Sequence, residues 1–298
     1  MADEESWFSV FPEMDRLDQR ELRKAVDSGF REFSGDYGGY IEAFFDPLKH
    51  FLIASESFLL ETPWLLILAG ILVICWFASR NWKIVVGAGV ALCLVGFFGM
   101  WEDTMRTLSI VFVCTVMAIV IGMPLGVMMA MSNRAQSVVT PILDIMQTMP
   151  SFVYLIPVVM LLGIGKVPGL IAVVVYAIPP LIRLTNLGIR LVDKEVLEAA
   201  DAFGASKRQK LFGVQIPLAL PNIMAGVNQT IMMALSMVVV ASMIGVKGLG
   251  QPVLKAINTQ QFFLGVMNGL AIVVLAILFD RVTQAYGLRI QKHRSQSH

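Results

Sequence analysis

Seven apolar runs, each close to the length needed to cross a lipid bilayer, constrain the fold of this chain more than any other feature. A membrane-crossing helix needs about 20 mostly apolar residues, and in lipid a helix satisfies its own backbone hydrogen bonds. The 298-residue chain is 56% hydrophobic and 15% charged, as expected of a membrane protein. We therefore predict an all-α polytopic membrane protein with about seven transmembrane helices, at residues 60–79, 84–100, 107–131, 141–163, 168–187, 218–245 and 264–286.

Prolines should bend some of these spans, and glycines should let others pack closely. The fourth and fifth spans are expected to kink or break at Pro141, Pro150, Pro157, Pro179 and Pro180. Two glycine pairs have the four-residue spacing of close helix–helix contacts, although glycine is also frequent in membrane helices generally. These pairs are Gly122 with Gly126 and Gly265 with Gly269.

The distribution of basic residues sets the predicted orientation. One side of the predicted spans carries 13 Lys and Arg residues, counting Arg183 and Arg281 near the ends of spans, and the loops on the other side carry 4. The positive-inside rule places the larger set, which includes residues 193–217 and the C-terminus, in the cytoplasm. Residues 1–62 hold 14 acidic and 6 basic residues and are predicted to begin outside, without a cleavable signal peptide.

The chain divides into four predicted parts. The first, residues 1–59, is an extracytoplasmic tail with amphipathic periodicity over 15–33 and 41–60. The second of these segments is expected to lie on the outer membrane surface. The other parts are the first two transmembrane helices (60–104), the transmembrane core with its cytoplasmic loop (105–286) and a cytoplasmic tail (287–298).

Residues 193–217 form the only long polar stretch between apolar spans. Asp193 can cap a first helix there, and Gly204 can take the positive φ that ends it. Ser206–Gln209 has the pattern of a capping box that starts a second helix, and Pro217 marks the next boundary. A plain reversal of chain direction would need only a few residues, so the sequence predicts a structured helix–turn–helix.

The first helix of this loop carries an apolar face, with Val196, Ala200 and Phe203 at helical spacing. Such a face on a membrane surface suggests docking to another protein. The loop also contains Glu198-Ala199-Ala200, Gly204, Val214 and Ile216-Pro217 in a fixed spacing. In these residues it resembles the EAA loop of ABC-importer permeases, which implies a coupling helix that sits in a groove of the ATPase. The alternative is a simple connecting loop.

Several longer runs resemble one branch of that family, the glycine betaine/proline betaine permeases. The runs are 147–157, 176–186, 228–239, 241–250 and 280–284. This resemblance implies the permease subunit of an importer for quaternary-ammonium osmolytes, with a type I ABC importer core, in the inner membrane of a bacterium. It also implies a second copy of the chain, two cytoplasmic ATPase subunits and an extracytoplasmic substrate-binding protein, and no nucleic-acid partner.

Two features depart from the family pattern. Lys247 stands where the family usually has a small or neutral residue, and the chain ends soon after Asp280 without a fused binding domain. A separate substrate-binding protein is therefore implied. The cargo stays open among glycine betaine, proline betaine, choline, trimethylamine N-oxide and sulfonium osmolytes. Aromatic cages, Trp above all, hold quaternary ammonium groups best, and all five Trp lie at or before residue 101. High-affinity selection is therefore expected on the partner.

The sequence offers no catalytic chemistry of its own. No Gly-x4-Gly-Lys-Ser/Thr segment occurs, so we expect ATP hydrolysis in a separate subunit and no enzymatic activity in this chain. Cys75, Cys93 and Cys114 fall inside apolar runs, and the three His residues stand apart from plausible partners. Neither a metal site nor a cofactor is expected.

Polar and soft side chains within the predicted spans are candidates for lining the substrate pathway. They are Gln147, Met149, Phe152, Tyr154, Asn228, Gln229, Met232 and Ser236. The amides could instead hydrogen-bond between helices, and the methionines could simply pack. Asp144 is the only acid between residues 104 and 192 and is assigned a structural role, with Arg183 as its candidate partner.

An ion-coupled secondary transporter is the main alternative. That class usually shows internal repeats and intramembrane carboxylates, and this sequence shows no convincing repeat and only one marginal Asp. A membrane scaffold or sensor would explain the docking loop but not the central spans broken by proline.

Overall fold

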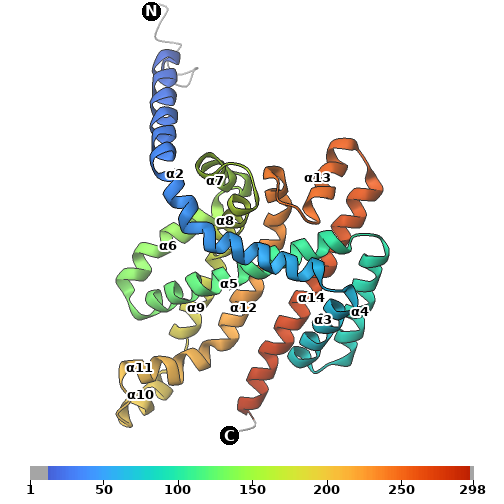
Figure 1. The fold of residues 1–298 in the computed structure, drawn as a ribbon. Helices are drawn as coiled ribbons and strands as arrows, with labels where there is room; N and C mark the ends of the chain where they lie inside the picture. Colours follow the sequence, from blue (N-terminus) through green and yellow to red (C-terminus); the bar gives the residue numbers. More distant parts are fainter. Residues whose placement is uncertain (1–12, 296–298) are drawn as a thin grey trace, which may run out of the picture.

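The computed structural model describes residues 13–295, with side chains as far as Gly287, and every regular element in this range is helical (Figure 1). The first elements are α2 (Arg16–Glu61), α3 (Trp64–Ser79), α4 (Trp82–Phe97), α5 (Trp101–Met131) and α6 (Asn133–Thr148). They are followed by η1 (Ser151–Tyr154), α7 (Leu155–Leu162), α8 (Lys166–Ala177), α9 (Pro179–Arg190), α10 (Lys194–Ala202) and α11 (Lys207–Lys210). The last are η2 (Leu211–Gln215), α12 (Ile216–Ala241), η3 (Ser242–Ile244), α13 (Gly250–Thr259) and α14 (Phe262–Ser295).

All seven predicted apolar runs are mainly helical, and four helical stretches are long and apolar enough to cross a membrane unaided. These are Trp101–Met131, Lys166–Arg190, Lys207–Ile244 and Phe262–Gly287. Two bent helix pairs raise the number to six if each pair is one span, and α4 is a shorter apolar helix. The seven-span count stays a prediction.

Prolines bend the fourth predicted span but do not interrupt the fifth. The fourth predicted span bends by 111° between α6 and η1, where Pro150 lies, as expected of a proline that disrupts a helix. Pro179 and Pro180 occupy the first positions of α9, where a missing N–H is tolerated. The helical stretch Lys166–Arg190 therefore passes these two prolines as one candidate span.

Helix α12 lies at the centre of the packed core, where it contacts α5, α8, α9 and α14. Close helix approach depends on glycine at the crossing of α5 and α9. A Cβ added at Gly126 would lie 2.6 Å from the Cβ of Thr185 and 2.8 Å from the carbonyl oxygen of Ile182. Because apolar side chains gain little by leaving lipid, such small-residue contacts carry much of the packing. The predicted close contact at Gly122 and Gly126 is confirmed.

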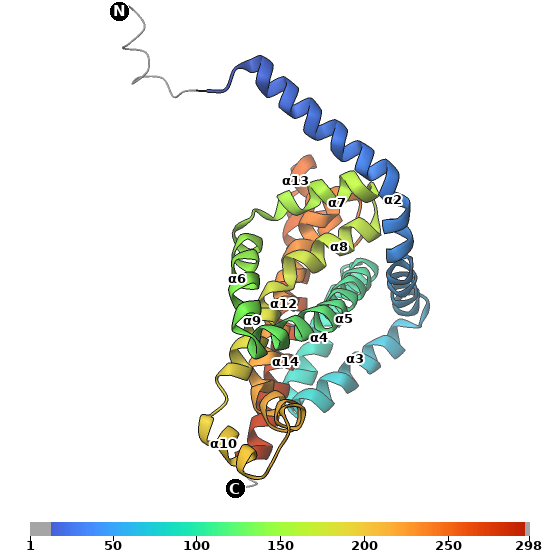
Figure 2. The same ribbon diagram turned by 90° about the vertical axis from the view of Figure 1, so that its left-hand side faces the viewer.

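The N-terminal segments predicted over 15–33 and 41–60 belong to one continuous helix, α2, of 46 residues. Its N-terminal half projects away from the other helices, and its C-terminal half packs against α5 (Figure 2). The side chain of Glu56 anchors it, because it lies 2.7 Å from Lys166 Nζ and 3.8 Å from Arg106 Nε. Sequence patterns do not predict this anchor, because its partners are distant along the chain.

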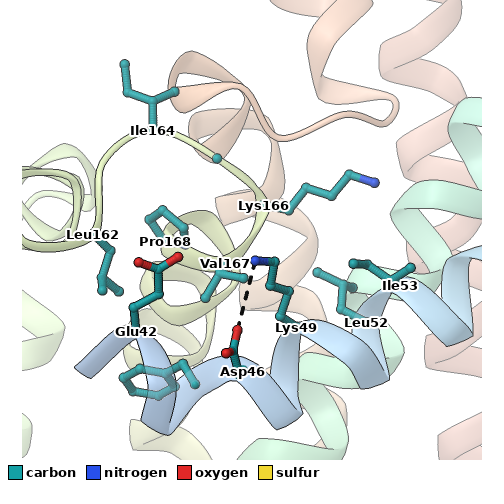
Figure 3. A pocket seen from close by; sticks show the side chains of 12 residues that line it. Glu42, Asp46, Lys49, Leu52, Ile53, Leu162, Ile164, Lys166, Val167 and Pro168 are labelled. Atoms are coloured by element: carbon teal, nitrogen blue, oxygen red, sulfur yellow. Dashed lines mark ion pairs between the residues drawn. The ribbon is translucent and has the colours of Figure 1, made fainter. Parts of the chain in front are cut away.

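A pocket of about 290 Å³ lies between α2 and the segment 162–168 that joins α7 to α8 (Figure 3). Glu42, Asp46 and Lys49 project into it from α2, and Lys49 Nζ lies 3.9 Å from Asp46 Oδ1. On the N-terminal side of this pocket α2 still contacts α7, because Ser34 Oγ donates to the carbonyl of Met160 at 3.1 Å.

Candidate functional site: the 193–217 loop and one face of α12

The 193–217 loop folds as two short helices around a tight turn, and its local hydrogen bonds follow the predicted pattern. Asp193 caps α10 by accepting a hydrogen bond from the backbone N–H of Glu195 at 3.0 Å. Gly204 has φ +75°, in the left-handed region that favours glycine. Ser206 and Gln209 form a reciprocal capping box at the start of α11. All three sequence predictions are confirmed.

The first helix of the loop, α10, stands clear of the helix bundle (Figures 1 and 2). No residue of α10 is buried, and Glu198 and Ala199 are exposed. The predicted apolar face is also uncovered: Val196 is exposed, and Phe203 at the end of the helix is 92% exposed. An exposed aromatic ring on a well-capped helix is suited to insertion into a partner protein.

An ion pair closes the turn between the two loop helices. Lys210 Nζ contacts both carboxylate oxygens of Asp201, which brings the last residue of α11 against the last turn of α10. Together with Gly204 and the capping box, this contact fixes the angle between the helices.

The second loop helix continues directly into the membrane. A single π-helical turn, η2, joins α11 to α12, so the helical stretch runs from Lys207 to Ile244 without a break. Pro217 lies in the first turn of α12 and does not end a helix there, because the first helical positions tolerate its missing N–H. The predicted helix boundary at Pro217 is therefore only a change from π-helical to α-helical geometry. Movement of the loop is therefore linked mechanically to α12.

Four α12 residues form an exposed row at helical spacing, which we call the α12 stripe. The row consists of Ala225, Gln229, Met232 and Ser236. Three of its members are predicted pathway residues. The fourth predicted residue on this helix, Asn228, is not part of the stripe and faces α14. Its Nδ2 donates to Asp280 Oδ1 at 2.8 Å, and its Oδ1 accepts from Thr283 Oγ1 at 2.6 Å. For Asn228, the alternative of an interhelical hydrogen bond is the one observed.

The remaining predicted pathway residues lie at the bend between α6 and η1. Gln147 and Phe152 are exposed, and Met149 packs partly against the core. Tyr154 is buried, its hydroxyl donates to the carbonyl of Met146, and its ring meets that of Tyr176 edge-on. Tyr154 thus stabilises the bend, and the exposed pair alone remains available to line a passage.

Asp144 forms the expected ion pair with Arg183, which joins α6 to α9. A second carboxylate, that of Asp280, was not singled out from the sequence. The signal that could have found it is its isolation, because it is the only acidic residue after Asp201.

Comparison with known proteins identifies the family of the chain. The family model described as "Binding-protein-dependent transport system inner membrane component" matches residues 122–292. The glycine betaine/proline betaine transport system permease protein ProW of Escherichia coli is 50% identical over 81% of this chain and 68% of its own length. The glycine betaine/carnitine transport permease protein GbuB of Listeria monocytogenes is 44% identical over 89% of this chain and 93% of its own.

Solved structures agree at the level of the fold. A chain of the MetNI methionine ABC transporter in an inward-facing conformation superimposes with a TM-score of 0.57 at 21% identity. The match covers 62% of this chain and 93% of the MetNI chain. The helices of this chain therefore have the arrangement of an ABC type I permease. The chain belongs to the family of inner membrane components of binding-protein-dependent transport systems.

Proposed function

We propose that this chain is the permease subunit of an ATP-driven importer for quaternary-ammonium osmolytes, with glycine betaine or proline betaine as the cargo. The names of the most similar relatives support this cargo, since the 50% and 44% identical proteins are glycine betaine permeases. Permeases named for trimethylamine N-oxide and choline are less similar, at 38% and 31% identity. The family assignment gives no support to an ion-coupled secondary transporter.

The observation that carries the proposal is the protruding, rigidly capped 193–217 loop with its uncovered apolar face. In the proposed assembly two copies of the chain pair, and each presents its loop to a separate ATPase subunit. Glu198 on α10 is placed for polar contact with that subunit, and Ala199 and Ala200 keep the helix surface narrow enough to enter a groove. Phe203 supplies an apolar anchor, since it is 92% exposed in this chain.

Transport then follows from the connection between loop and membrane. A movement of α10 and α11 caused by the ATPase passes through η2 into α12, because the helix is continuous there. The α12 stripe faces the second copy in this proposal and lines the passage between the two. Its Gln, Met and Ser side chains offer weak contacts to a methylated ammonium, which suits a path that the cargo must also leave.

Selection of the cargo is assigned to a separate extracytoplasmic binding protein. The α12 stripe contains no aromatic residue, and each Trp lies at or before residue 101. A high-affinity cage for a quaternary ammonium needs such rings.

The proposed orientation puts the N-terminus outside and the 193–217 loop in the cytoplasm, in accord with 13 against 4 basic residues.

Affinity purification of the membrane-extracted complex tests the assembly. The tagged chain should retain an ATP-hydrolysing partner in equal amount, and ATP turnover should disappear when that partner is removed. A purified chain that retains no ATPase, and that takes up glycine betaine on a sodium or proton gradient alone, would contradict the proposal.

A further inference from the structure

Asp280 on α14 is an isolated carboxylate within a candidate membrane span. It lies in the stretch Phe262–Gly287, which is long and apolar enough to cross a bilayer, and it is the only acidic residue after Asp201. Among the side chains that the structure describes, no Lys or Arg forms an ion pair with it. An ionisable residue within a membrane span is costly, which makes Asp280 a candidate functional residue.

The contacts of Asp280 are neutral amides. Asn228 Nδ2 donates to its Oδ1 at 2.8 Å, and Gln284 Nε2 donates to the same oxygen at 2.6 Å. Thr283 Oγ1 in turn donates to Asn228 Oδ1 at 2.6 Å. These bonds orient the carboxylate between α12 and α14, and within the described side chains its hydrogen-bond partners carry no positive charge.

A pocket of about 430 Å³ adjoins this network, between the same two helices. In Figure 1 α12 and α14 diverge as they run towards the 193–217 loop and the C-terminus. The pocket is lined by the partners of the carboxylate and by two members of the α12 stripe, together with a thioether. These lining residues are Met224, Ala225, Asn228, Gln229, Thr283 and Gln284. The proposed passage and the carboxylate network thus meet in one cavity.

We propose that this pocket binds the quaternary ammonium head group of the cargo on the loop-proximal part of the passage, with Asp280 as the counter-charge. This inference rests on the proposed function. A quaternary ammonium donates no hydrogen bond, so it needs negative potential and polarisable contacts rather than free lone pairs. Met224 lines the pocket and supplies polarisable contact. The negative potential comes from Asp280, which lies behind the lining and is hydrogen-bonded to the lining residues Asn228 and Gln284.

A metal cation fits the same groups less well. Ca²⁺ and Mg²⁺ require about six oxygen ligands that converge on the ion. Here Asp280 Oδ1 already accepts two hydrogen bonds, and Asn228 Oδ1 already accepts one from Thr283. The lining also lacks an aromatic ring, so binding is weak, as a passage requires.

The test uses the complete complex with its ATPase and binding protein in proteoliposomes. Asp280→Asn keeps an oxygen that can accept from Asn228 and Gln284 but removes the charge. Glu102→Gln is the matched control, because the Glu102 side chain is 73% exposed on α5. Asp280→Asn should slow glycine betaine uptake about tenfold at saturating loaded binding protein, while the half-saturating concentration of that protein stays unchanged. The control should import at the wild-type rate.

A second measurement keeps Asp280 in place. Ala225→Cys, in a chain whose three native cysteines are replaced by alanine, provides a thiol at the pocket wall. Tetramethylammonium chloride should slow its modification by a methanethiosulfonate reagent, and equal sodium chloride should not.

Wild-type uptake by Asp280→Asn, or equal modification rates in the two salts, would overturn the inference and leave these residues as an interhelical hydrogen-bond network. Glycine betaine import by the wild-type complex tests the proposed function independently of Asp280. Its absence would overturn the proposed function itself.

Discussion

Lys210 Nζ lies 2.5 Å from Oδ1 and 2.7 Å from Oδ2 of Asp201, so one ion pair holds the two helices of the 193–217 loop together across Gly204. The side chain of Lys210 is 23% exposed and that of Asp201 is 54% exposed. Ion pairs at such exposure add only about 0.2–1 kcal/mol to stability. The value of this pair therefore lies in the angle it fixes, immediately before the π-helical turn that leads into α12.

The first prediction is a charge-swap rescue at this pair. Asp201→Lys and Lys210→Asp should each reduce ATP-driven uptake severalfold, because like charges then face each other across the turn. The double exchange should restore most of the activity, while membrane insertion stays the same in all three variants. Uptake in proteoliposomes provides the measurement. Full activity in both single variants would show that the contact does not matter for coupling.

The second prediction concerns helix packing at Gly126. Gly126→Val should lower the thermal stability of the purified chain, because even the first added carbon would lie 2.6 Å from Thr185 Cβ. Overpacking of this kind costs about 1–3 kcal/mol. Gly269→Val is the matched control, since nothing lies within 4 Å of a Cβ added there. Equal melting temperatures for the two variants in the same detergent would argue against a tight α5–α9 contact.

The third prediction is the membrane topology. With seven spans, reporter fusions after Glu56 and after Arg289 should report opposite sides of the membrane, outside for the first and inside for the second. The basis is the 13-to-4 asymmetry of basic residues. Two fusions on the same side would show that the span count is wrong by one.

Local chemistry explains which features of the loop could be predicted from the sequence. Capping by Asp193, the positive φ of Gly204 and the capping box from Ser206 all depend on residues within a few positions of each other. The Asp144–Arg183 pair was also within reach, because few charges exist in the core and each needs a partner.

Features that depend on distant parts of the chain were out of reach. Asn228 meets Asp280 only because α12 and α14 pack together. Helical periodicity does not show which helix the side chain of Asn228 would contact. Glu56 meets Lys166 across 110 positions for the same reason. The π-helical turn at 211–215 has no recognisable sequence signal, so the sequence predicts a boundary at Pro217 instead.

The fourth prediction addresses coupling through the loop. Gly204→Val forces a β-branched residue into a left-handed conformation, with a strain of about 1–3 kcal/mol, and should tilt α10 relative to α11. Gly204→Asn is the matched control, because asparagine tolerates this region of φ. Glu198→Arg reverses an exposed charge at the proposed ATPase contact, where loss of a buried partner costs about 2–5 kcal/mol of binding.

The most direct measurement is ATP-driven uptake of radiolabelled glycine betaine by proteoliposomes that contain this chain, its ATPase and its loaded binding protein. Wild type and Gly204→Asn should import the cargo, whereas Gly204→Val and Glu198→Arg should insert normally and import almost none. The binding protein should hold its ligand equally well beside each variant. Near-normal import by both Gly204→Val and Glu198→Arg would contradict the account, because the 193–217 loop would then be only a connection between two membrane helices.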